Sequence, residues 1–395
     1  MIIKFNKEVN NNLKPAILKV IRENLPYYFP NLKFIRISRS CIIFDFIKKI
    51  KNKKLIQKKL LSFINKTILD YSSLKYKILY KHKTIKQKKL KNPFEFLIKN
   101  NQINQNDRGK FVYRKNFSKL FFALDTLIKK EAIKHGATEE IYPSTIKTST
   151  LIKSKYLKSF PQHAYFVAPS KVDQKILKKL NNYGVNSKNK KGIPNNVLGQ
   201  LDHSLCPSAC YPFFEAGENK ELPIQMVTSL VNCHRFEVSD VKHLQRLQSY
   251  WVREIIFYNK LKNNQKNLSN FMKWINKTLV RWEINFEIST ANDPFFLDVG
   301  RKVVKFQSAQ NLKHELLLNY NNNKKIAVGS FNNHLNHLTN AFKFKSKRKI
   351  PHTSACIGFG IDRFLYALFW QLGININKWP KKIKKDLKIN QITKS

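Results

Sequence analysis

The chain has 395 residues and a formal net charge of +49 at pH 7. A chain of this length can bury a full core and can hold two domains, which excludes a small scaffold that depends on disulfides. The charge would suit RNA, DNA or an acidic protein. However, Lys, Asn and Ile are frequent even in stretches without a motif, so we attribute most of the charge to an AT-rich genome.

The first 80 residues are predicted to form a small basic α+β domain. IIKF is typical of a short strand, LKPAILKVIRENL has the apolar spacing of a helix, and LKFIRISRSCIIFDF alternates like a strand. A second basic helix is predicted at NKKLIQKKLLSFINKTIL and a further strand at LKYKILYKH. Residues 81–114 are polar and basic, and we interpret them as a linker.

Residues 115–375 are predicted to form a larger α+β domain. Its first helix, FSKLFFALDTLIKKEAIKHG, is expected to end at Gly136. An irregular run begins at Pro143, and residues 170–200 have the composition of a solvent-exposed insertion. Short strand-like runs follow and end in HTSACIGFGIDRFLYALFWQLG, which predicts a strand, a glycine turn and an apolar helix. Residues 376–395 are expected to be a solvated basic tail.

The cysteines and the apolar segments indicate the cellular compartment in which the protein resides. The five cysteines are odd in number and widely spaced, which argues against a disulfide framework and favours a reduced cytosol. The N-terminal segment lacks the apolar core of a signal peptide. The most apolar late segment contains Asp362 and Arg363, which argues against a membrane helix. We expect a cytoplasmic protein that makes no membrane contact.

The first candidate for chemistry is the pair Arg235 and Glu237 in CHRFEVSD. Residues two apart on an extended segment point the same way. The guanidinium could therefore pair with a phosphate while the carboxylate accepts a hydrogen bond from the exocyclic amine of a base. A surface ion pair is the ordinary alternative for this motif.

A second candidate is the run HLQRLQSYWVREIIFYN, which retains Arg246 and Arg253 in a chain that otherwise prefers Lys. WVREIIF is typical of a strand, so Arg253 and Glu254 are predicted to face opposite sides. A charge inside such a strand is costly unless it is paired or bound to an ion. The segment alone leaves open a buried ion pair between two strands.

The glycines of CIGFGIDRF form a third candidate. Gly358 and Gly360 fall where a strand should meet a helix, and glycine lets backbone approach a ligand closely. Arg363 opens the helix, where a guanidinium can stack on a base or reach a phosphate. A tight turn with a solvated Arg363 would give the same pattern.

The fourth candidate is a metal site built from three separate segments. Cys210, Glu254 and Cys356 are ligand types that suit a catalytic zinc ion, which commonly has three protein ligands and one open position. Cys206 lies four residues before Cys210 and competes for the same role. Buried cysteines that act as small apolar side chains remain the plainer alternative.

Four segments in one order resemble a known family. RFE…RLQSYWVREIIFYN, ANDPFFLDVGRKVVKFQSAQNLKHELL, GSFNNHLNH and HTSACIGFGIDRFLYALF are similar to the amino acid:[carrier protein] ligases, which are truncated relatives of methanogen-type seryl-tRNA synthetases. The resemblance covers residues 142–373. It implies a class II synthetase core, in which helices flank a mostly antiparallel sheet.

The resemblance implies roles at an ATP site. Arg235 and Glu237 correspond to the pair that touches the α-phosphate and the adenine, and Arg363 would lie on one face of the base. Tyr250 corresponds to the aromatic residue that stacks on its other face. We expect Arg235 and Arg363 to be catalytic, with Mg²⁺ beside the phosphates. Further ATP contacts are implied for Gln245, Arg246, Ser330 and Asn332.

The resemblance also implies one zinc ion per chain. It assigns Cys210, Glu254 and Cys356 as the ligands, selects Cys210 over Cys206, and places the substrate α-amino group at the open position, so Glu254 also lies in the substrate site. Asn292 and Asp293 fall near the amino-acid pocket. Pro143 matches a proline that packs at the interface of a homodimer.

Three functions remain open after the resemblance. The favoured one activates a small amino acid as its adenylate and transfers it to the phosphopantetheine thiol of an acidic carrier protein. The second is a zinc-dependent seryl-tRNA synthetase, for which the basic N-terminal domain would suit tRNA. The third is a non-catalytic RNA-binding paralogue. It is disfavoured because compositional drift would have removed unused Arg and Cys residues first.

Overall fold

The computed structural model describes two folded units. The described residues are 2–4, 17, 20–21, 24–25, 27–29, 32–37, 41–46, 52–72, 76–84, 92–185, 192–238, 241, 243–291, 312–321, 324–346 and 352–394. In this part of the chain, no helix is long and apolar enough to cross a membrane.

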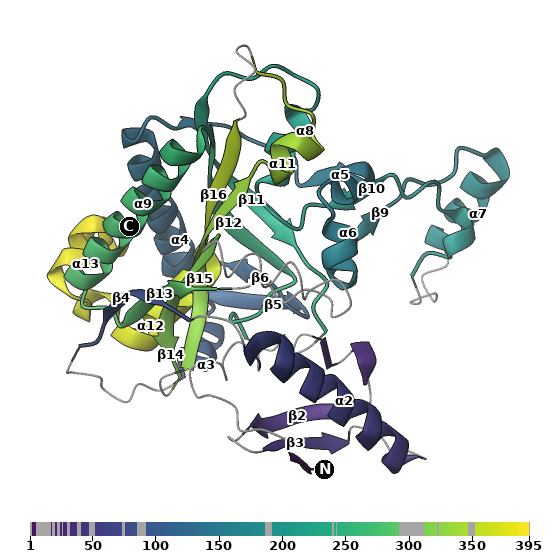
Figure 1. The fold of residues 1–395 in the computed structure, drawn as a ribbon, viewed down its shortest axis with the longest axis horizontal. Helices are drawn as coiled ribbons and strands as arrows, with labels where there is room; N and C mark the ends of the chain where they lie inside the picture. The colour runs from purple at the N-terminus through teal and green to yellow at the C-terminus, as the bar shows by residue number, and fades with distance from the viewer. Residues whose placement is uncertain are drawn as a thin grey trace.

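The larger unit is built on a sheet of eight strands (Figure 1). Neighbouring strands are antiparallel, apart from the short edge strand β7, which is parallel to β11. The order across the sheet is β4 (Ile78–His82), β13 (Phe286–Thr290), β14 (Lys313–Tyr320), β15 (Lys324–Leu335), β16 (Thr353–Gly360), β12 (Ser249–Asn259), β11 (Gln225–His234) and β7 (Thr138–Glu139). This is the mostly antiparallel α+β core that the sequence predicts.

Three long helices cover one face of this sheet. They are α4 (Lys115–Lys134), α9 (Leu261–Arg281) and α12 (Ile361–Leu372). Their apolar positions pack on every second residue of the central strands, such as Ile255 and Phe257 of β12. The bulk of the core therefore lies between the helices and this face.

The opposite face carries smaller clusters. Ile256 and Tyr258 of β12 pack with Phe213 and Phe214 of α8 (Tyr211–Ala216) and with Leu338 of α11 (His337–Ala341). A second cluster lies beside α5 (Thr148–Lys153), α6 (Tyr156–Ser159) and the small sheet of β8 (Thr145–Lys147), β10 (His203–Leu205) and β9 (Phe166–Val167). Short helices and loops therefore cover this face.

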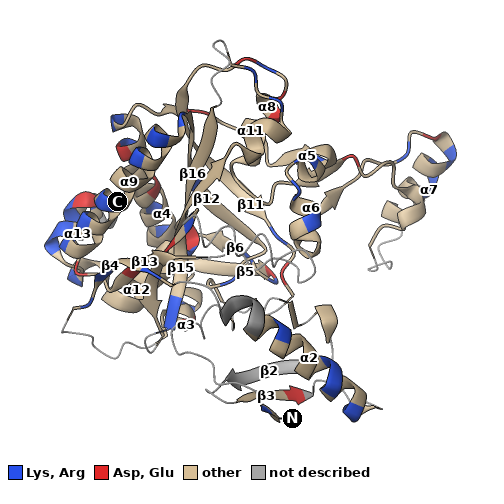
Figure 2. Cartoon of the chain, in the orientation of Figure 1, with Lys and Arg blue, Asp and Glu red and all other residues tan. Residues whose placement is uncertain are grey.

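The smaller unit belongs to the N-terminal region. Its sheet has the order β1 (Ile2–Lys4), β3 (Cys41–Phe46), β2 (Leu32–Ile37), and α2 (Lys53–Ser72) packs on it. The unit has an apolar cluster of its own, against which Phe160 of the larger unit packs. Figure 2 marks positions of Lys and Arg along α2, and also on α9 and α13, so the charge is spread over both units.

Three expectations about the elements were wrong. The strand at the end of LKYKILYKH, β4, pairs with β13 and belongs to the large sheet. The supposed linker contains α3 (Pro93–Lys99) and a hairpin of β5 (Ile103–Asp107) and β6 (Lys110–Tyr113). The supposed solvated tail contains α13 (Lys381–Asp386) and α14 (Ile389–Lys394), whose Ile383 and Ile389 are buried in the main core. In each case a few apolar side chains with distant partners outweigh a basic composition.

The expected exposed insertion is present. Its helix α7 (Gln174–Val185) projects from the larger unit (Figure 1), and its described residues are half-buried or exposed. Residues 170–185 and 192–200, the described part of the segment, contribute nothing to the main core.

Candidate functional site

The turn between β11 and β12 holds the predicted nucleotide residues. Arg235 follows the last residue of β11, and its backbone N–H donates to the Gln248 carbonyl oxygen at 3.0 Å. The Nε atom of Arg235 donates to the Pro207 carbonyl oxygen at 2.9 Å. These two contacts fix the guanidinium beside the loop that precedes α8.

Glu237 and Arg246 are paired within this turn. Arg246 Nε and Nη2 lie 2.8 and 2.7 Å from Glu237 Oε2. The amide of Gln248 also donates to the Glu237 backbone carbonyl at 2.8 Å. The structure thus brings the predicted Arg246 to Glu237, while Gln245 lies half-buried in the same turn.

Tyr250 joins the two predicted catalytic arginines. The Cζ atoms of Arg235 and Arg363 each lie 5.8 Å from the centroid of the Tyr250 ring. Arg363 is in the first turn of α12, and burial lowers the pKa of its guanidinium. Two guanidinium groups beside one aromatic ring are the side-chain types that suit an anionic, aromatic ligand such as a nucleotide.

The sequence analysis did not predict the backbone contacts of Gly109 that stabilise this turn. Gly109, in the hairpin between β5 and β6, accepts hydrogen bonds from the backbone N–H groups of Gln248 and Ser249 at 2.9 and 3.3 Å. Its φ is +68°, and a Cβ there would lie 2.8 Å from Gln248 N. A glycine between two polar residues in NDRGK was a turn signal, but its partner is 139 residues away, from 109 to 248.

A second group of side chains lies on the same sheet face. The ligand atoms of Cys210, His334 and Cys356 all lie within 4.8 Å of one another, and the Cys356 Sγ–His334 Nε2 distance is 3.4 Å. Cys210 precedes α8, whereas His334 and Cys356 are on the neighbouring strands β15 and β16. A hydrogen bond with Cys210, together with burial, holds the pKa of the Cys356 thiol above its usual value.

Glu254 approaches this group from β12. Its side chain hydrogen-bonds with Cys356, and burial raises its pKa to about 7. Gly358 stands opposite Glu254 in the strand register, and a Cβ on Gly358 would lie 2.7 Å from Glu254 Oε2. The glycine therefore leaves the space that the carboxylate occupies.

The donor set fits a zinc ion. Two thiols, an imidazole and a carboxylate are the ligand types that zinc prefers. Cys210, Glu254 and Cys356 are each at most 4% exposed, and a bound metal would favour the deprotonated form of the Cys356 thiol, whose pKa is raised without one. Cys210 and Cys356 lie together with His334, a donor that the sequence analysis did not predict, whereas Glu254 reaches this group through its hydrogen bond with Cys356.

Cys206 lies elsewhere. It is fully buried in the cluster that contains Val231 and Cys233, and its Sγ donates to the Ser208 carbonyl oxygen at 3.1 Å. Cys206 is therefore not part of the cysteine and histidine group around Cys356.

Arg253 faces the opposite side of β12. It is 1% exposed, and its Nε and Nη2 each lie 2.7 Å from a carboxylate oxygen of Asp125 in α4. Its Nη1 also reaches Glu139 of β7 at 3.2 Å. The ion pair that the sequence left open for Arg253 is present, and it joins the sheet to a helix.

The remaining predicted residues are distributed as follows. Asn332 donates to the Ser330 Oγ at 3.2 Å and to Cys356 Sγ at 3.6 Å, so both residues lie on β15 beside the cysteine group. Asn292 and Asp293 lie outside the described residues.

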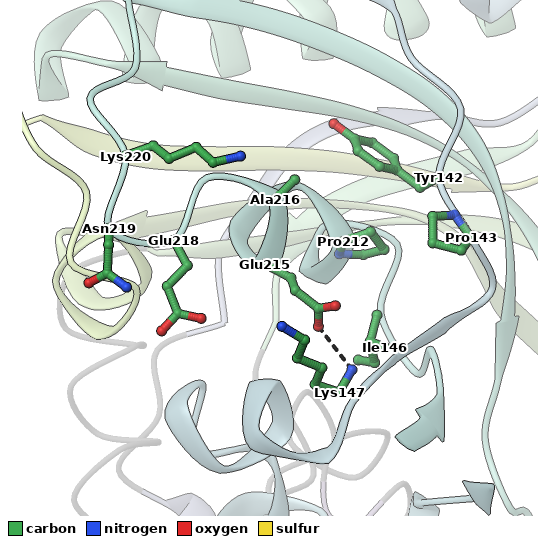
Figure 3. A pocket seen from close by; sticks show the side chains of 10 residues that line it. All are labelled: Tyr142, Pro143, Ile146, Lys147, Pro212, Glu215, Ala216, Glu218, Asn219 and Lys220. Carbon is green, nitrogen blue, oxygen red and sulfur yellow. Dashed lines mark hydrogen bonds between the residues drawn. The ribbon is translucent and has the colours of Figure 1, made fainter. Parts of the chain in front are cut away.

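A cavity of about 440 Å³ lies beside Pro143, the residue expected at a dimer interface (Figure 3). Tyr142 and Pro143 stand at one end, and Glu215 accepts a hydrogen bond from the backbone N–H of Lys147 at 3.0 Å. The described residues that line it include none of the predicted ATP or metal residues. The cavity is therefore distinct from the two groups above.

Comparison with solved structures identifies the fold. A Methanopyrus kandleri seryl-tRNA synthetase, solved in complex with an Aquifex aeolicus tRNASec, superposes with a TM-score of 0.70 over 98% of this chain and 77% of that chain, at 16% identity. The chain has a class II synthetase fold. A cytoplasmic serine–tRNA ligase of Naegleria fowleri in complex with AMP has the same core, with a TM-score of 0.59 at 10% identity, over 85% of this chain and 70% of that one.

The sequence relatives of this class II chain are ligases. The type-2 serine–tRNA ligase of Methanocaldococcus jannaschii is 26% identical over 296 residues, which cover 71% of this chain and 56% of the relative. The amino acid–[acyl-carrier-protein] ligase 1 of Bradyrhizobium diazoefficiens is 29% identical over 261 residues, which cover 64% of this chain and 77% of the relative. The chain spans little more than half the length of the type-2 ligases that it matches. No family model matches it.

Proposed function

We propose that this chain activates an amino acid with ATP to form an aminoacyl-adenylate, with the amino group of the substrate held by zinc. The observation that carries the proposal is the position of two groups on one strand. Tyr250, flanked by Arg235 and Arg363, and Glu254, which reaches the cysteine group, both belong to β12 and face the same side.

The spacing of the two groups suits the two ends of an aminoacyl-adenylate. Four residues of an extended strand span about 13 Å. The adenine would lie against Tyr250, the phosphate beside Arg235, and the amino acid at the cysteine group. No other pair of groups on this face combines cations around an aromatic ring with buried metal-binding side chains within the described residues.

The chemistry requires positioning and charge stabilisation rather than a protein nucleophile. The substrate carboxylate attacks the α-phosphorus of ATP, and pyrophosphate leaves. Arg235 and Arg363 stabilise the charge on the phosphates, together with Mg²⁺ that arrives with ATP. When bound, zinc would hold the α-amino group as a neutral amine, which excludes hydroxy acids.

Glu237 has an acceptor oxygen beyond the one that Arg246 uses. Both contacts of Arg246 are to Oε2, so Oε1 could accept from the exocyclic amine of adenine, either beside Arg246 or after Arg246 moves away. Arg246 would then be available to a phosphate, which is the role that the resemblance implies for it. The same proposal retains supporting ATP contacts for Gln245, Ser330 and Asn332, and substrate contacts for Asn292 and Asp293.

The activation step is tested by amino-acid-dependent pyrophosphate exchange with each of the twenty amino acids. We expect exchange with one or a few small amino acids. Arg235→Ala should abolish it, whereas Arg281→Ala, which removes a half-exposed cation on α9, should leave it unchanged. Absence of exchange with every amino acid, in protein that contains zinc, would overturn the proposal and favour a non-catalytic paralogue.

The acceptor of the activated amino acid has two candidates. The sequence of residues 291–365 resembles the amino acid:[carrier protein] ligases, which favours the phosphopantetheine thiol of an acidic carrier protein. The Bradyrhizobium relative is named as a ligase that acts on an acyl carrier protein. A tRNA is favoured by the N-terminal unit, because the superposition with the synthetase that was solved with tRNA extends over 98% of this chain. On this observation, we place tRNA ahead of the carrier protein as the acceptor to test first.

Transfer of a labelled amino acid separates the two acceptors. Serine tRNA, with a transcript lacking the 3′-terminal adenosine as control, is compared with holo carrier protein, with apo carrier protein as control. If tRNA is the acceptor, replacing Lys54, Lys58 and Lys59 of α2 by Ala should reduce charging and leave pyrophosphate exchange intact. The same number of replacements on α13 (Lys381, Lys382 and Lys385) is the matched control, because both sets are on basic helices. Labelling of the carrier protein alone would select the first candidate.

We further propose a homodimer that forms at Pro143. The supporting observations are the exposed Ile141, which is 93% exposed, and the cavity beside Pro143. Single exposed apolar residues are common on protein surfaces, so the support from Ile141 lies in its position two residues before Pro143. Sedimentation should give twice the mass of the chain, and Ile141→Glu should shift it towards the monomer.

A further inference from the structure

His334 lies close enough to the cysteine group to be a ligand. It is near the end of β15, and its Nε2 is 3.4 Å from Cys356 Sγ. Nε2 also belongs to the set of ligand atoms from Cys210, His334 and Cys356 that all lie within 4.8 Å of one another. In a tetrahedral zinc site with usual bond lengths, a thiolate sulfur and an imidazole nitrogen are about 3.5 Å apart. The observed separation already matches this value.

The imidazole is held in the orientation that ligation requires. Nδ1 lies 3.1 Å from the Ser354 Oγ. A proton on Nδ1 that is donated to this hydroxyl leaves the lone pair of Nε2 directed at the thiols, as in metal sites where the second ring nitrogen is fixed by a hydrogen bond. The ring also packs against Phe214 at a centroid distance of 5.9 Å and an angle of 71°. Ring rotation is therefore restricted.

Cys210, His334 and Cys356 supply three donors within 4.8 Å of one another, and Glu254, which hydrogen-bonds with Cys356, is a fourth donor at the edge of this group. Four protein ligands are typical of a closed zinc site, whereas three leave a position for substrate. Glu254 contacts Cys356 from β12, and His334 contacts it from β15, so the two lie on strands that flank β16 on opposite sides.

We propose that His334 is a protein ligand of the metal and occupies the position that the substrate amine must take. This inference rests on the metal site of the proposed function. The resting site is closed by His334, and the amino group of the substrate replaces the imidazole nitrogen.

The proposal is tested by metal affinity and by cobalt absorption in the full chain. Wild type, His334→Ala, His334→Cys and His337→Ala are titrated against a graded series of chelators, and the metal content is measured at each step. His334→Ala should lower the apparent affinity at least about tenfold. His334→Cys should retain the metal because a thiolate can replace the imidazole. His337→Ala is the matched control, since His337 is an exposed histidine three residues further along, and it should behave as wild type.

The cobalt-substituted protein reports the ligand directly. His334→Ala should shift the visible bands of the wild-type protein, because water replaces a nitrogen donor. Addition of the cognate amino acid should shift the bands of the wild type and bring the two proteins to the same spectrum, because the imidazole is absent from both sites at that point.

The outcomes separate this proposal from the proposed function. Unchanged affinity and an unchanged cobalt spectrum in His334→Ala overturn the role of His334 and leave zinc at Cys210, Glu254 and Cys356 in place. An equal loss of metal in His337→Ala would attribute the effect to folding of this loop and would also overturn it. A wild-type chain that binds no metal overturns this inference together with the zinc of the proposed function, while pyrophosphate exchange still decides on adenylate formation.

Discussion

The two faces of β12 each carry a buried ionisable side chain, and only one of the two side chains has an ion-pair partner. On the helix face, Arg253 is 1% exposed and meets both oxygens of Asp125. On the other face, the adjacent Glu254 is 4% exposed and lies beside a thiol, and the described residues include no ion pair to it. The charge of Arg253 is paired within the protein, whereas the carboxyl group of Glu254 has no ion-pair partner among the described residues.

This difference separates structure from function along a single strand. Paired charges such as Arg253 and Asp125 fix the position of a helix on the sheet, and breaking such a pair is strongly destabilising. A buried carboxylate without an ion-pair partner, beside a thiol, is costly unless a cation binds. We therefore expect a ligand on the face that carries the unpaired Glu254.

Among the variants that test this difference, removal of one thiol should have the largest effect on metal content and activity. Cys356→Ala should reduce metal content from about one ion per chain to nearly none, and pyrophosphate exchange should fall at least about 100-fold, because the amino group loses its anchor. Metal analysis and exchange assays measure both. Cys206→Ala is the control, since Cys206 lies in a separate cluster. Full metal occupancy in Cys356→Ala would contradict the ligand set.

Removal of the paired charge should affect stability instead. Arg253→Met leaves Asp125 buried without its cation and should lower the free energy of unfolding by about 3–5 kcal/mol. Denaturant titration measures this. The double variant Arg253→Met with Asp125→Leu should recover much of the loss, because neither charge then remains unpaired. If both variants lose stability equally, packing around Arg253 rather than charge is responsible.

A third buried carboxylate, Asp362, is stabilised by neutral donors. It accepts from the backbone N–H of Trp251 at 2.7 Å, and burial raises its pKa to about 6. Between its ordinary pKa and this value, the unfolded chain releases the proton and the folded chain keeps it. The free energy of unfolding should therefore fall as the pH rises from about 4 to 6, by up to about 3 kcal/mol.

Asp362→Asn should remove the part of this pH dependence that belongs to Asp362, because the amide oxygen keeps the hydrogen bond from Trp251 and carries no charge. The buried Glu254, whose pKa is raised to about 7, should still contribute a fall in the same direction. Asp202→Asn, on an exposed loop, serves as the control. Denaturant midpoints measured across the pH window provide the readout. A fall with pH that persists unchanged in Asp362→Asn would assign the titration to another group.

The smallest effect is expected at the edge of the nucleotide pocket. Arg363→Ala removes one of the two guanidinium groups near Tyr250 and should raise the KM for ATP about 10–100-fold, which corresponds to about 1.4–2.7 kcal/mol. The KM for the amino acid should change less, because the metal group is about 13 Å further along β12. Equal changes in both constants would place Arg363 outside the ATP site.

The sequence alone determined the alternation on β12 and the types of residue at the site. Strand geometry fixed Arg253 and Glu254 on opposite faces before any partner was known. The class II core followed from a resemblance that runs through ordered motifs, as did the choice of Cys210 over Cys206. These properties depend on local spacing or on short runs of sequence, so a single chain displays them.

Only the tertiary structure decided the contacts between distant segments. Asp125 meets Arg253 across 128 residues, and Gly109 supports the β11–β12 turn across 139. His334 joins the cysteine group because β15 and β16 lie side by side. The apolar residues of the basic C-terminal segment were likewise undervalued, since burial depends on partners elsewhere in the chain. Local sequence patterns thus predict the type of each site residue and the face on which it lies, whereas the packing of the sheet determines which of these residues come into contact.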